Sequence, residues 1–117
     1  MPSRRPAVGE LWLAYVEFID RPGVGKVRPA AVVDVDEATR TVIALKVTSR
    51  DLRDDPAIPC LPIEDWERRG LVKPSFIRLD QRFELAWERL LRDTPLGTLG
   101  ANDMKAIEDF LGDGSAS

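Results

Sequence analysis

Three short segments of the sequence combine cations, hydroxyls and a carboxylate in ways that support chemistry. In chain order they are Lys26-Val27-Arg28-Pro29, Thr48-Ser49-Arg50 and Arg78-Leu79-Asp80. Arginine presents a planar fork of donors that fits phosphate oxygens. Carboxylates and hydroxyls can move or orient a proton. Together the three segments offer phosphate contacts and proton transfer.

Each segment also has a purely structural interpretation. The first places a basic pair at the junction of a glycine-containing loop and a strand, where Arg28 can simply be ion-paired. Hydroxyls at strand ends, as in the second, commonly bond the local backbone. An arginine and an acid two residues apart on one strand face commonly form a charge pair. The residues alone leave both interpretations open at each segment.

The composition excludes several classes of site. There is no histidine, which removes Ser-His-Asp triads, Cys-His pairs and histidine-ligated metals. The single Cys60 allows no internal disulfide and no cysteine cluster for zinc, and it is expected to be a small buried side chain. Asp51, Asp54 and Asp55 alternate with arginines, so they predict a solvated loop with internal ion pairs rather than a metal site.

The charge is distributed unevenly along the chain. The net charge is -3, and residues 101–117, with one lysine and four acidic residues, account for all of it. The rest of the chain is therefore balanced, which softens the objection that a pI of about 5.0 raises against a nucleic-acid partner. Arginines outnumber lysines by 13 to 4, a bias that suits phosphate contacts and equally fits the composition of the source genome.

The first half of the chain predicts three strands. Residues 8–19, 28–35 and 41–48 are rich in aromatic and β-branched side chains. Residues 20–26 contain one proline and two glycines and are expected to form a loop. The short turn at residues 36–40 predicts an antiparallel hairpin from the two strands that flank it.

The second half predicts shorter elements. Residues 58–63 contain two prolines and are expected to form an edge strand. In residues 75–81, Arg78 and Asp80 fall on one strand face, and Ile77 and Leu79 fall on the other. Residues 64–69 are expected to form one helical turn closed by Gly70. Residues 84–92 could be helical, while residues 89–99 could hold a further strand. A helix is expected over residues 100–111, ended by Gly112.

These elements predict a mainly β fold with a C-terminal helix. Five or six short, mostly antiparallel strands suggest a strongly bent sheet or half-open barrel, with the helix covering an opening. Trp12, Trp66 and Trp87 are expected to pack in the interior. Residues 1–117 are expected to form one domain with flexible ends at 1–7 and 112–117. The start of the chain has no apolar stretch typical of a secretory signal, so we expect a cytoplasmic protein.

Five stretches occur in a familiar order and spacing. They are Gly9-Glu10-Leu11-Trp12-Leu13, Gly25-Lys26-Val27-Arg28-Pro29-Ala30-Ala31-Val32-Val33, Thr41-Val42-Ile43-Ala44-Leu45-Lys46-Val47-Thr48-Ser49, Lys73-Pro74-Ser75-Phe76-Ile77-Arg78-Leu79-Asp80-Gln81, and Glu88-Arg89-Leu90 with Gly97-Thr98-Leu99-Gly100 and Asp103-Met104. On these residues the chain resembles the MazF/PemK/Kid toxin family of prokaryotic toxin–antitoxin systems. Each motif is loose, but five in order over residues 9–111 are specific.

The resemblance implies a small barrel of the plasmid-toxin type, related in shape to SH3-like barrels and working as a homodimer. Family members cut single-stranded RNA, often at short recognition sequences, without metal, so no cofactor is expected. The partner implied is a cognate antitoxin, whose disordered C-terminal segment winds over the dimer and blocks its groove.

The resemblance also assigns residues. The family's catalytic arginine matches Arg28, and its partner hydroxyl matches Thr48. An arginine and an aspartate that matter in Kid-like members match Arg78 and Asp80. Residues expected to contact RNA are Lys26, Pro29, Ser49, Gln81 and Arg21.

Metal-free cleavage of this kind uses the 2′-hydroxyl of the RNA as nucleophile on the adjacent phosphorus. It needs a base for that hydroxyl, a cation on the phosphorane oxygens and an acid for the leaving 5′-oxygen. Arg28 would clamp the phosphate, Thr48 would orient it, and Arg78 with Asp80 would supply a second cation and a proton-transfer partner. The assignment of acid and base stays open. The products would carry 2′,3′-cyclic phosphate and 5′-hydroxyl ends.

Two departures from the family pattern keep an alternative open. Some Kid-like members use a histidine near the first loop, and Arg21 or Lys26 can replace only its charge. Residues 82–87 also differ from the usual sequence after the Asp-Gln pair. The alternative is a non-catalytic toxin-fold module that binds an antitoxin or inhibits another protein, as CcdB-like proteins do. Convergence of Arg28, Thr48 and Asp80 on one groove would favour the enzyme.

Overall fold

The structure is a computed structural model that describes residues 5–18 and 21–115. Its elements, in chain order, are β1 (Glu10–Phe18), β2 (Arg21–Asp36), β3 (Thr41–Thr48), β4 (Cys60–Pro62), β5 (Phe76–Ala86), the short 3₁₀ helix η1 (Trp87–Arg89), β6 (Gly97–Thr98) and α1 (Ala101–Ser115).

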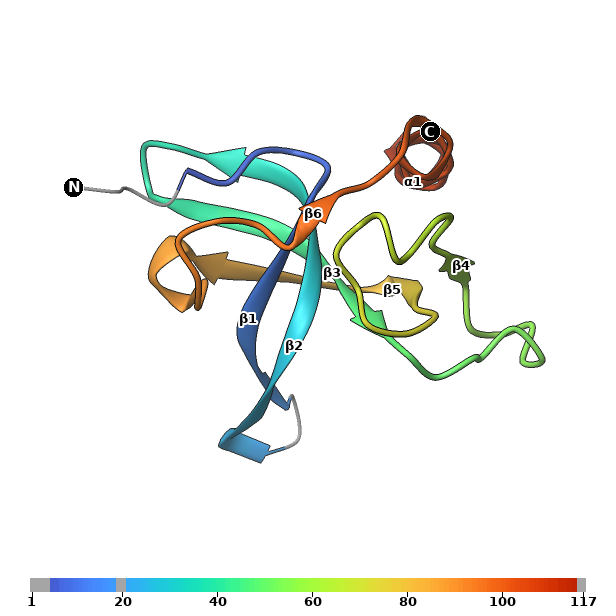
Figure 1. The fold of residues 1–117 in the computed structure, drawn as a ribbon, viewed down its shortest axis with the longest axis horizontal. Helices are drawn as coiled ribbons and strands as arrows, with labels where there is room; N and C mark the ends of the chain where they lie inside the picture. Colours follow the sequence, from blue (N-terminus) through green and yellow to red (C-terminus); the bar gives the residue numbers. More distant parts are fainter. Residues whose placement is uncertain (1–4, 19–20, 116–117) are drawn as a thin grey trace.

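Within the described residues, the six strands form one antiparallel sheet with the order β4-β5-β3-β2-β1-β6. The sheet curls on itself, and α1 lies beyond its edge beside the segment that joins β4 to β5 (Figure 1). This arrangement confirms the prediction of a mainly β, strongly bent sheet with one C-terminal helix.

The prediction of a loop over residues 20–26 is wrong for the described part of that segment. β2 begins at Arg21, and its first half pairs with β1, with Lys26 opposite Val16 and Gly25 opposite Glu17. The register shifts between Glu17 and Phe18, and Gly23 adopts a φ of +84° that favours glycine. The glycines therefore mark an irregularity within a strand pair rather than its end. The result is a long β1–β2 hairpin that projects from the sheet (Figure 1).

Both faces of the sheet carry a hydrophobic cluster, because β1, β2 and β3 alternate apolar side chains between them. The larger cluster includes Leu11, Leu45 and Ile77 and continues to Ile107 of α1. The smaller cluster, on the opposite face, includes Trp12 and Val32. The three tryptophans pack as predicted: Trp12 is buried in the smaller cluster, Trp66 packs on the larger one and Trp87 on the smaller one.

The first turn of helix α1 is bonded to the segment that follows β4. Asp103 is buried, and its Oδ2 accepts a hydrogen bond from the backbone N–H of Glu64 at 3.0 Å. Burial raises the pKa of the Asp103 carboxyl, and that hydrogen bond opposes the shift. The helix does not end at Gly112 as expected but continues to Ser115. Phe110, near the end of the helix, is 41% exposed.

The short elements between these strands differ in detail from expectation. Residues 64–70 form turns, with the N–H of Arg69 bonded to the carbonyl of Asp65 and a positive φ at Gly70. The ambiguous segment continues β5 to Ala86 and then forms η1, and the later strand is only the two-residue β6. β4 lies at the sheet edge, as its prolines predicted.

Candidate functional site

The three candidate segments lie on neighbouring strands of one sheet face. Lys46 on β3 is opposite Ala30 of β2 on one side and opposite Arg78 of β5 on the other. Arg28 lies two residues from Ala30, so it is a diagonal neighbour of Lys46 on the same face, with backbones about 7–8 Å apart. Thr48 lies two residues beyond Lys46 on the same strand and also shares that face. Arg28, Lys46, Thr48, Arg78 and Asp80 are called the cationic site below.

The sequence pattern of β5 explains how Arg78 and Asp80 reach this face. Ile77 is fully buried in the larger cluster and Leu79 packs against it. Arg78 and Asp80 therefore point to the other side, as the alternation predicted. The same rule places the cationic site on the face that holds the smaller cluster, beside Trp12 and Val32.

Arg78 and Asp80 form a two-bond fork. Nε and Nη2 of Arg78 donate to the two carboxylate oxygens of Asp80 at 2.8 and 2.7 Å. This contact raises the pKa of Arg78 and lowers the pKa of Asp80. Asp80 is thus an ionised carboxylate throughout the neutral range, and it cannot donate a proton there.

A second fork of the same spacing provides a comparison. Arg53 donates to both oxygens of Asp51 in the loop after β3, and the pKa of Asp51 falls to about 2. The side chains of that pair are 55% and 48% exposed, against 15% and 34% for Arg78 and Asp80. The exposed pair confirms the predicted internal ion pairing of that loop. The Arg78–Asp80 pair is more enclosed and is held against the sheet.

Arg28 does not adopt the ion-paired state of the structural interpretation. No described carboxylate forms a salt bridge with it, and its Nε is buried with no acceptor in the described part of the chain. An unpaired buried donor costs about 1–3 kcal/mol. A phosphate oxygen placed at this Nε would pair the donor with a charged acceptor.

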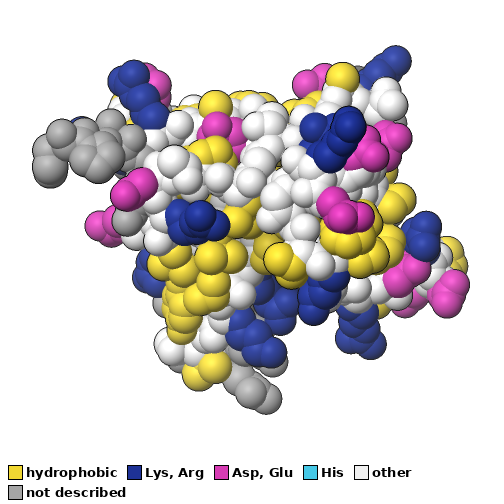
Figure 2. Space-filling model, in the orientation of Figure 1, with side chains coloured by type: hydrophobic (Ala, Val, Ile, Leu, Met, Phe, Trp, Pro, Cys, Tyr) yellow, Lys and Arg dark blue, Asp and Glu magenta, His cyan; other side chains and the backbone are white. Residues whose placement is uncertain are grey.

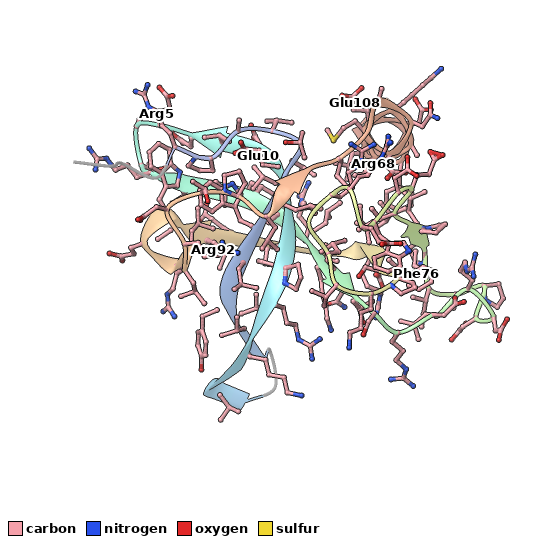
Figure 3. All side chains as sticks on the ribbon, viewed as in Figure 1. Arg5, Glu10, Arg68, Phe76, Arg92 and Glu108 are labelled. Atoms are coloured by element: carbon pink, nitrogen blue, oxygen red, sulfur yellow. The ribbon has the colours of Figure 1, made fainter. Side chains whose placement is uncertain are left out.

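Thr48 is half-buried at the end of β3, opposite Phe76. Its Oγ1 accepts a hydrogen bond from the N–H of Arg50 at 3.1 Å, which is the local backbone contact that the structural interpretation expected. That bond fixes the oxygen and leaves the hydroxyl proton available to a further acceptor. Phe76, labelled in Figure 3, is the first residue of β5 and lies next to β4, and the guanidinium of Arg53 covers its ring at 5.1 Å.

Lys46 is the member of the cationic site that the sequence analysis left out. Burial, and then the charges of Arg28 and Arg78, lower the pKa of its ammonium, while Asp80 acts in the opposite direction. The signal was present, because Lys46 and Thr48 are two residues apart in a strand and so share a face. Three cations against one carboxylate make the site a place for an anion.

Figure 2 shows Lys and Arg side chains gathered at the lower part of the molecule, between the β1–β2 hairpin and the loop after β3. Acidic side chains on this view lie mainly above and to the right of them. These basic side chains lie in the region of the molecule where β2, β3 and β5 carry the cationic site.

The residues expected to contact RNA do not all lie on the face of the cationic site. Lys26 is exposed and shares the face of Arg28 farther along the hairpin, and Ser49 is exposed beside Thr48. Pro29 alternates to the opposite face, because it is opposite Leu13 and lies next to Arg28. Gln81 is half-buried in the irregular part of β5. The side chain of Arg21 lies outside the described residues.

Cys60 lies opposite Arg78 across the β4–β5 pairing. It is half-buried rather than buried, which corrects the expectation of a fully interior side chain. The short edge strand explains this, because no strand among the described residues pairs with β4 on its outer side.

Removing Arg78 is expected to raise the pKa of Asp80 toward the ordinary aspartate value. The reason is that the Arg78 fork is the largest cause of the lowered pKa. The measurement is a ¹³C NMR titration of the Asp80 carboxyl in wild type and Arg78→Ala. Because the folded pKa is lowered, the fork stabilises the fold above the unfolded pKa, and this stabilisation is lost as pH falls through the folded value.

The matched control is Arg53→Ala, which should release the pKa of Asp51 and leave that of Asp80 unchanged. An unchanged Asp80 titration in Arg78→Ala would show that the fork does not set the charge of the site.

The described residues contain no group of three or more Cys, Asp or Glu side chains placed to hold a metal ion. Within the same residues, no helix combines the length and apolar character needed to cross a bilayer.

Comparison with known proteins agrees with the fold and with the motif order. The family model described as "PemK-like, MazF-like toxin of type II toxin-antitoxin system" matches residues 7–113. No curated protein sequence matches the chain.

Solved structures of similar fold include proteins of Deinococcus radiodurans and of mycobacteria. MazF of Deinococcus radiodurans in Form-I is 23% identical, with a TM-score of 0.66, over 96% of this chain and 97% of that one. The MazE–MazF Form-III structure from the same organism is 22% identical, with a TM-score of 0.67, over 92% and 94%. A mycobacterial endoribonuclease in complex with its cognate antitoxin is 20% identical, with a TM-score of 0.61, over 92% and 96%.

At these identities the solved structures show only a shared fold. The family is shown by the family model, which matches residues 7–113. The five ordered motifs, the curled sheet with its C-terminal helix and the match over residues 7–113 agree. The chain belongs to the PemK-like, MazF-like toxin family of type II toxin–antitoxin systems.

Proposed function

We propose that this protein is a metal-independent endoribonuclease toxin that cleaves single-stranded RNA at selected sequences. The observation that supports this most directly is the cationic site. Three cations, a hydroxyl and an ionised carboxylate lie on one sheet face around Lys46. That is the set of groups needed to bind a phosphodiester and move protons without a metal ion.

Each residue takes a role that fits its surroundings. Arg28 clamps the scissile phosphate, since its buried Nε lacks a described acceptor. Thr48 orients the phosphate or the 2′-hydroxyl with the proton that its bond to Arg50 leaves available. Arg78 holds Asp80 and adds positive charge. Asp80, ionised at neutral pH, accepts the proton of the 2′-hydroxyl.

The resulting reaction is an internal transesterification. The 2′-oxygen attacks the adjacent phosphorus while the bond to the 5′-oxygen breaks. The products carry 2′,3′-cyclic phosphate and 5′-hydroxyl ends. Lys26 and Ser49, exposed on either side of the cationic site, contact the flanking nucleotides.

The partners proposed are a second copy of this chain and a cognate antitoxin. Structures of similar fold include a MazE–MazF complex and an endoribonuclease with its cognate antitoxin, which supports an antitoxin here. A disordered segment of that antitoxin would cover the cationic site and exclude RNA.

Incubation of the purified protein with a long single-stranded RNA in excess EDTA tests this function. We expect discrete cuts, with fragments that a polynucleotide kinase labels at the 5′ end without prior phosphatase treatment. Sequencing those ends gives the cut motif. Products with 3′-hydroxyl ends, or a requirement for added metal, would refute the mechanism.

Absence of cleavage by folded protein would favour the alternative, a non-catalytic module that binds an antitoxin or a CcdB-like target. The two outcomes are separable because the same preparation can be assayed for folding by circular dichroism and for antitoxin binding.

A further inference from the structure

Lys46 occupies the centre of the cationic site. Its strand lies between the strands of Arg28 and Arg78, and it is directly opposite Arg78. It is half-buried on the face that carries Thr48. A phosphate held by Arg28 and Arg78 from either side therefore lies over Lys46.

The proposed reaction needs a group that gives a proton to the leaving 5′-oxygen, and most of the site cannot do so. Asp80 is ionised and forked to Arg78. The same fork raises the pKa of Arg78, and arginine keeps its protons throughout the accessible pH range. The sequence contains no histidine. Lys46 is the remaining cation of the site, and an ammonium gives up a proton far more readily than a guanidinium.

We propose that Lys46 is the general acid of the reaction, an inference that rests on the proposed ribonuclease function. The 2′-oxygen forms a bond to phosphorus and gives its proton to the Asp80 carboxylate. The bond from phosphorus to the 5′-oxygen breaks, its electron pair moves to that oxygen, and the oxygen takes a proton from Nζ of Lys46. Exchange of one proton with solvent at each residue then restores the ammonium and the carboxylate.

The charges around Lys46 suit this role. Arg28 from β2 and Arg78 from β5 lower the pKa of its ammonium together with burial, so it gives up its proton more readily than an exposed lysine. Asp80 from β5 opposes them, and Cys60 from β4 lies beyond Arg78. A bound phosphodiester adds negative charge that favours the protonated form when substrate is present.

A substrate with a better leaving group separates proton donation from phosphate binding. The probe is an oligonucleotide with the mapped cut site, made once with the natural 5′-oxygen and once with sulfur in that bridging position. A thiolate leaves without protonation, because thiols are far more acidic than alcohols. Rates are measured for wild type, Lys46→Ala, Lys46→Arg and Arg28→Ala.

Both Lys46 variants are expected to lose about 10²–10⁴-fold in rate on the oxygen substrate, the usual contribution of general acid catalysis. On the sulfur substrate they are expected to lie within about tenfold of wild type, since no proton is needed. Lys46→Arg keeps the positive charge, so a lower rate in this variant cannot be attributed to the loss of that charge from the fold or from the phosphate contact. Arg28→Ala is expected to be slow on both substrates.

Two results would overturn the proposal. An equal loss on both substrates would make Lys46 a positioning residue for the phosphate, and unchanged rates would remove it from the reaction. If wild-type protein that is folded cleaves neither substrate, the proposed function itself fails. That outcome is distinct from the other two, in which wild type is active.

Discussion

Replacing Arg28 with alanine is expected to slow RNA cleavage by about 10²–10³-fold, comparable to removing one donor from an oxyanion site. The guanidinium lies beside Lys46 on the cationic site, and its Nε is a buried donor with no described acceptor. Its contact with the phosphate strengthens as charge develops on the phosphorane oxygens, so the loss should fall mainly on the rate at saturating RNA. The measurement is single-turnover cleavage of an oligonucleotide with the mapped cut site.

Arg28→Lys tests whether charge alone is sufficient. Lysine is a point charge and cannot present the two-pronged fork, so we expect it to recover only part of the lost rate. The matched control is Arg68→Ala. Arg68 is exposed and lies beside α1 in Figure 3, away from β2 and the cationic site, so its removal should leave the rate unchanged.

Retention of full activity by Arg28→Ala would remove the phosphate clamp from the mechanism. Because the Nε of Arg28 is already a buried donor without a described acceptor, removing it should not lower the thermal transition below that of wild type. A reduced rate without a lowered melting temperature therefore reports on the site and not on the fold.

Much of this site follows from strand periodicity. Arg78 and Asp80 share a face because Ile77 and Leu79 need the opposite one, and the turn at residues 36–40 fixes β2 and β3 as antiparallel neighbours. The bounds of β3 were predicted correctly at Thr41 and Thr48 because that strand alternates cleanly between two apolar clusters.

The rest of the site depends on the register between strands that are far apart in the sequence. The local pattern of residue types does not determine that register. β5 has three residues between the partners of Leu45 and Lys46, since Leu45 is opposite Arg82 and Lys46 is opposite Arg78. That irregularity places Arg78 directly across from Lys46. Periodicity places Lys46 on the face of Thr48, but it could not show which side chains of β5 meet Lys46.

The β1–β2 hairpin shows a second limit. Proline and glycine signals describe local backbone preference, whereas the pairing of Arg21, Gly25 and Lys26 with β1 comes from a partner strand that tolerates a bulge. The same signals therefore mark a loop in one context and an irregular strand in another.

Gly97→Ala is expected to destabilise the fold by about 3 kcal/mol or more, the range of severe overpacking. A Cβ at Gly97 would lie 2.1 Å from the carbonyl oxygen of Arg69 and 2.5 Å from its carbonyl carbon. Both are backbone atoms, so no side-chain rotation relieves the clash. At Gly70, an added Cβ would lie 2.0 Å from the carbonyl oxygen of Leu96, so the two chain segments touch at both glycines.

This contact holds β6 in place. Leu96 donates its N–H to Leu11 at 2.7 Å and Leu99 donates its N–H to Gly9 at 2.8 Å, and both bonds flank the crowded position. Displacing Gly97 from Arg69 would strain these bonds and the start of α1. Differential scanning calorimetry should show a melting temperature lower by roughly 10 °C or more for a domain of this size.

The matched control is Gly112→Ala, with the opposite expected sign. Gly112 lies within α1, and a Cβ there would meet nothing within 4 Å. Alanine is a better helix former than glycine by about 0.5–1 kcal/mol, so this variant should melt slightly above wild type. If Gly97→Ala had the same melting temperature as Gly112→Ala, the close approach of Arg69 and Gly97 would not be a constraint on the fold. The Gly97 of the closing motif would then need an explanation other than packing.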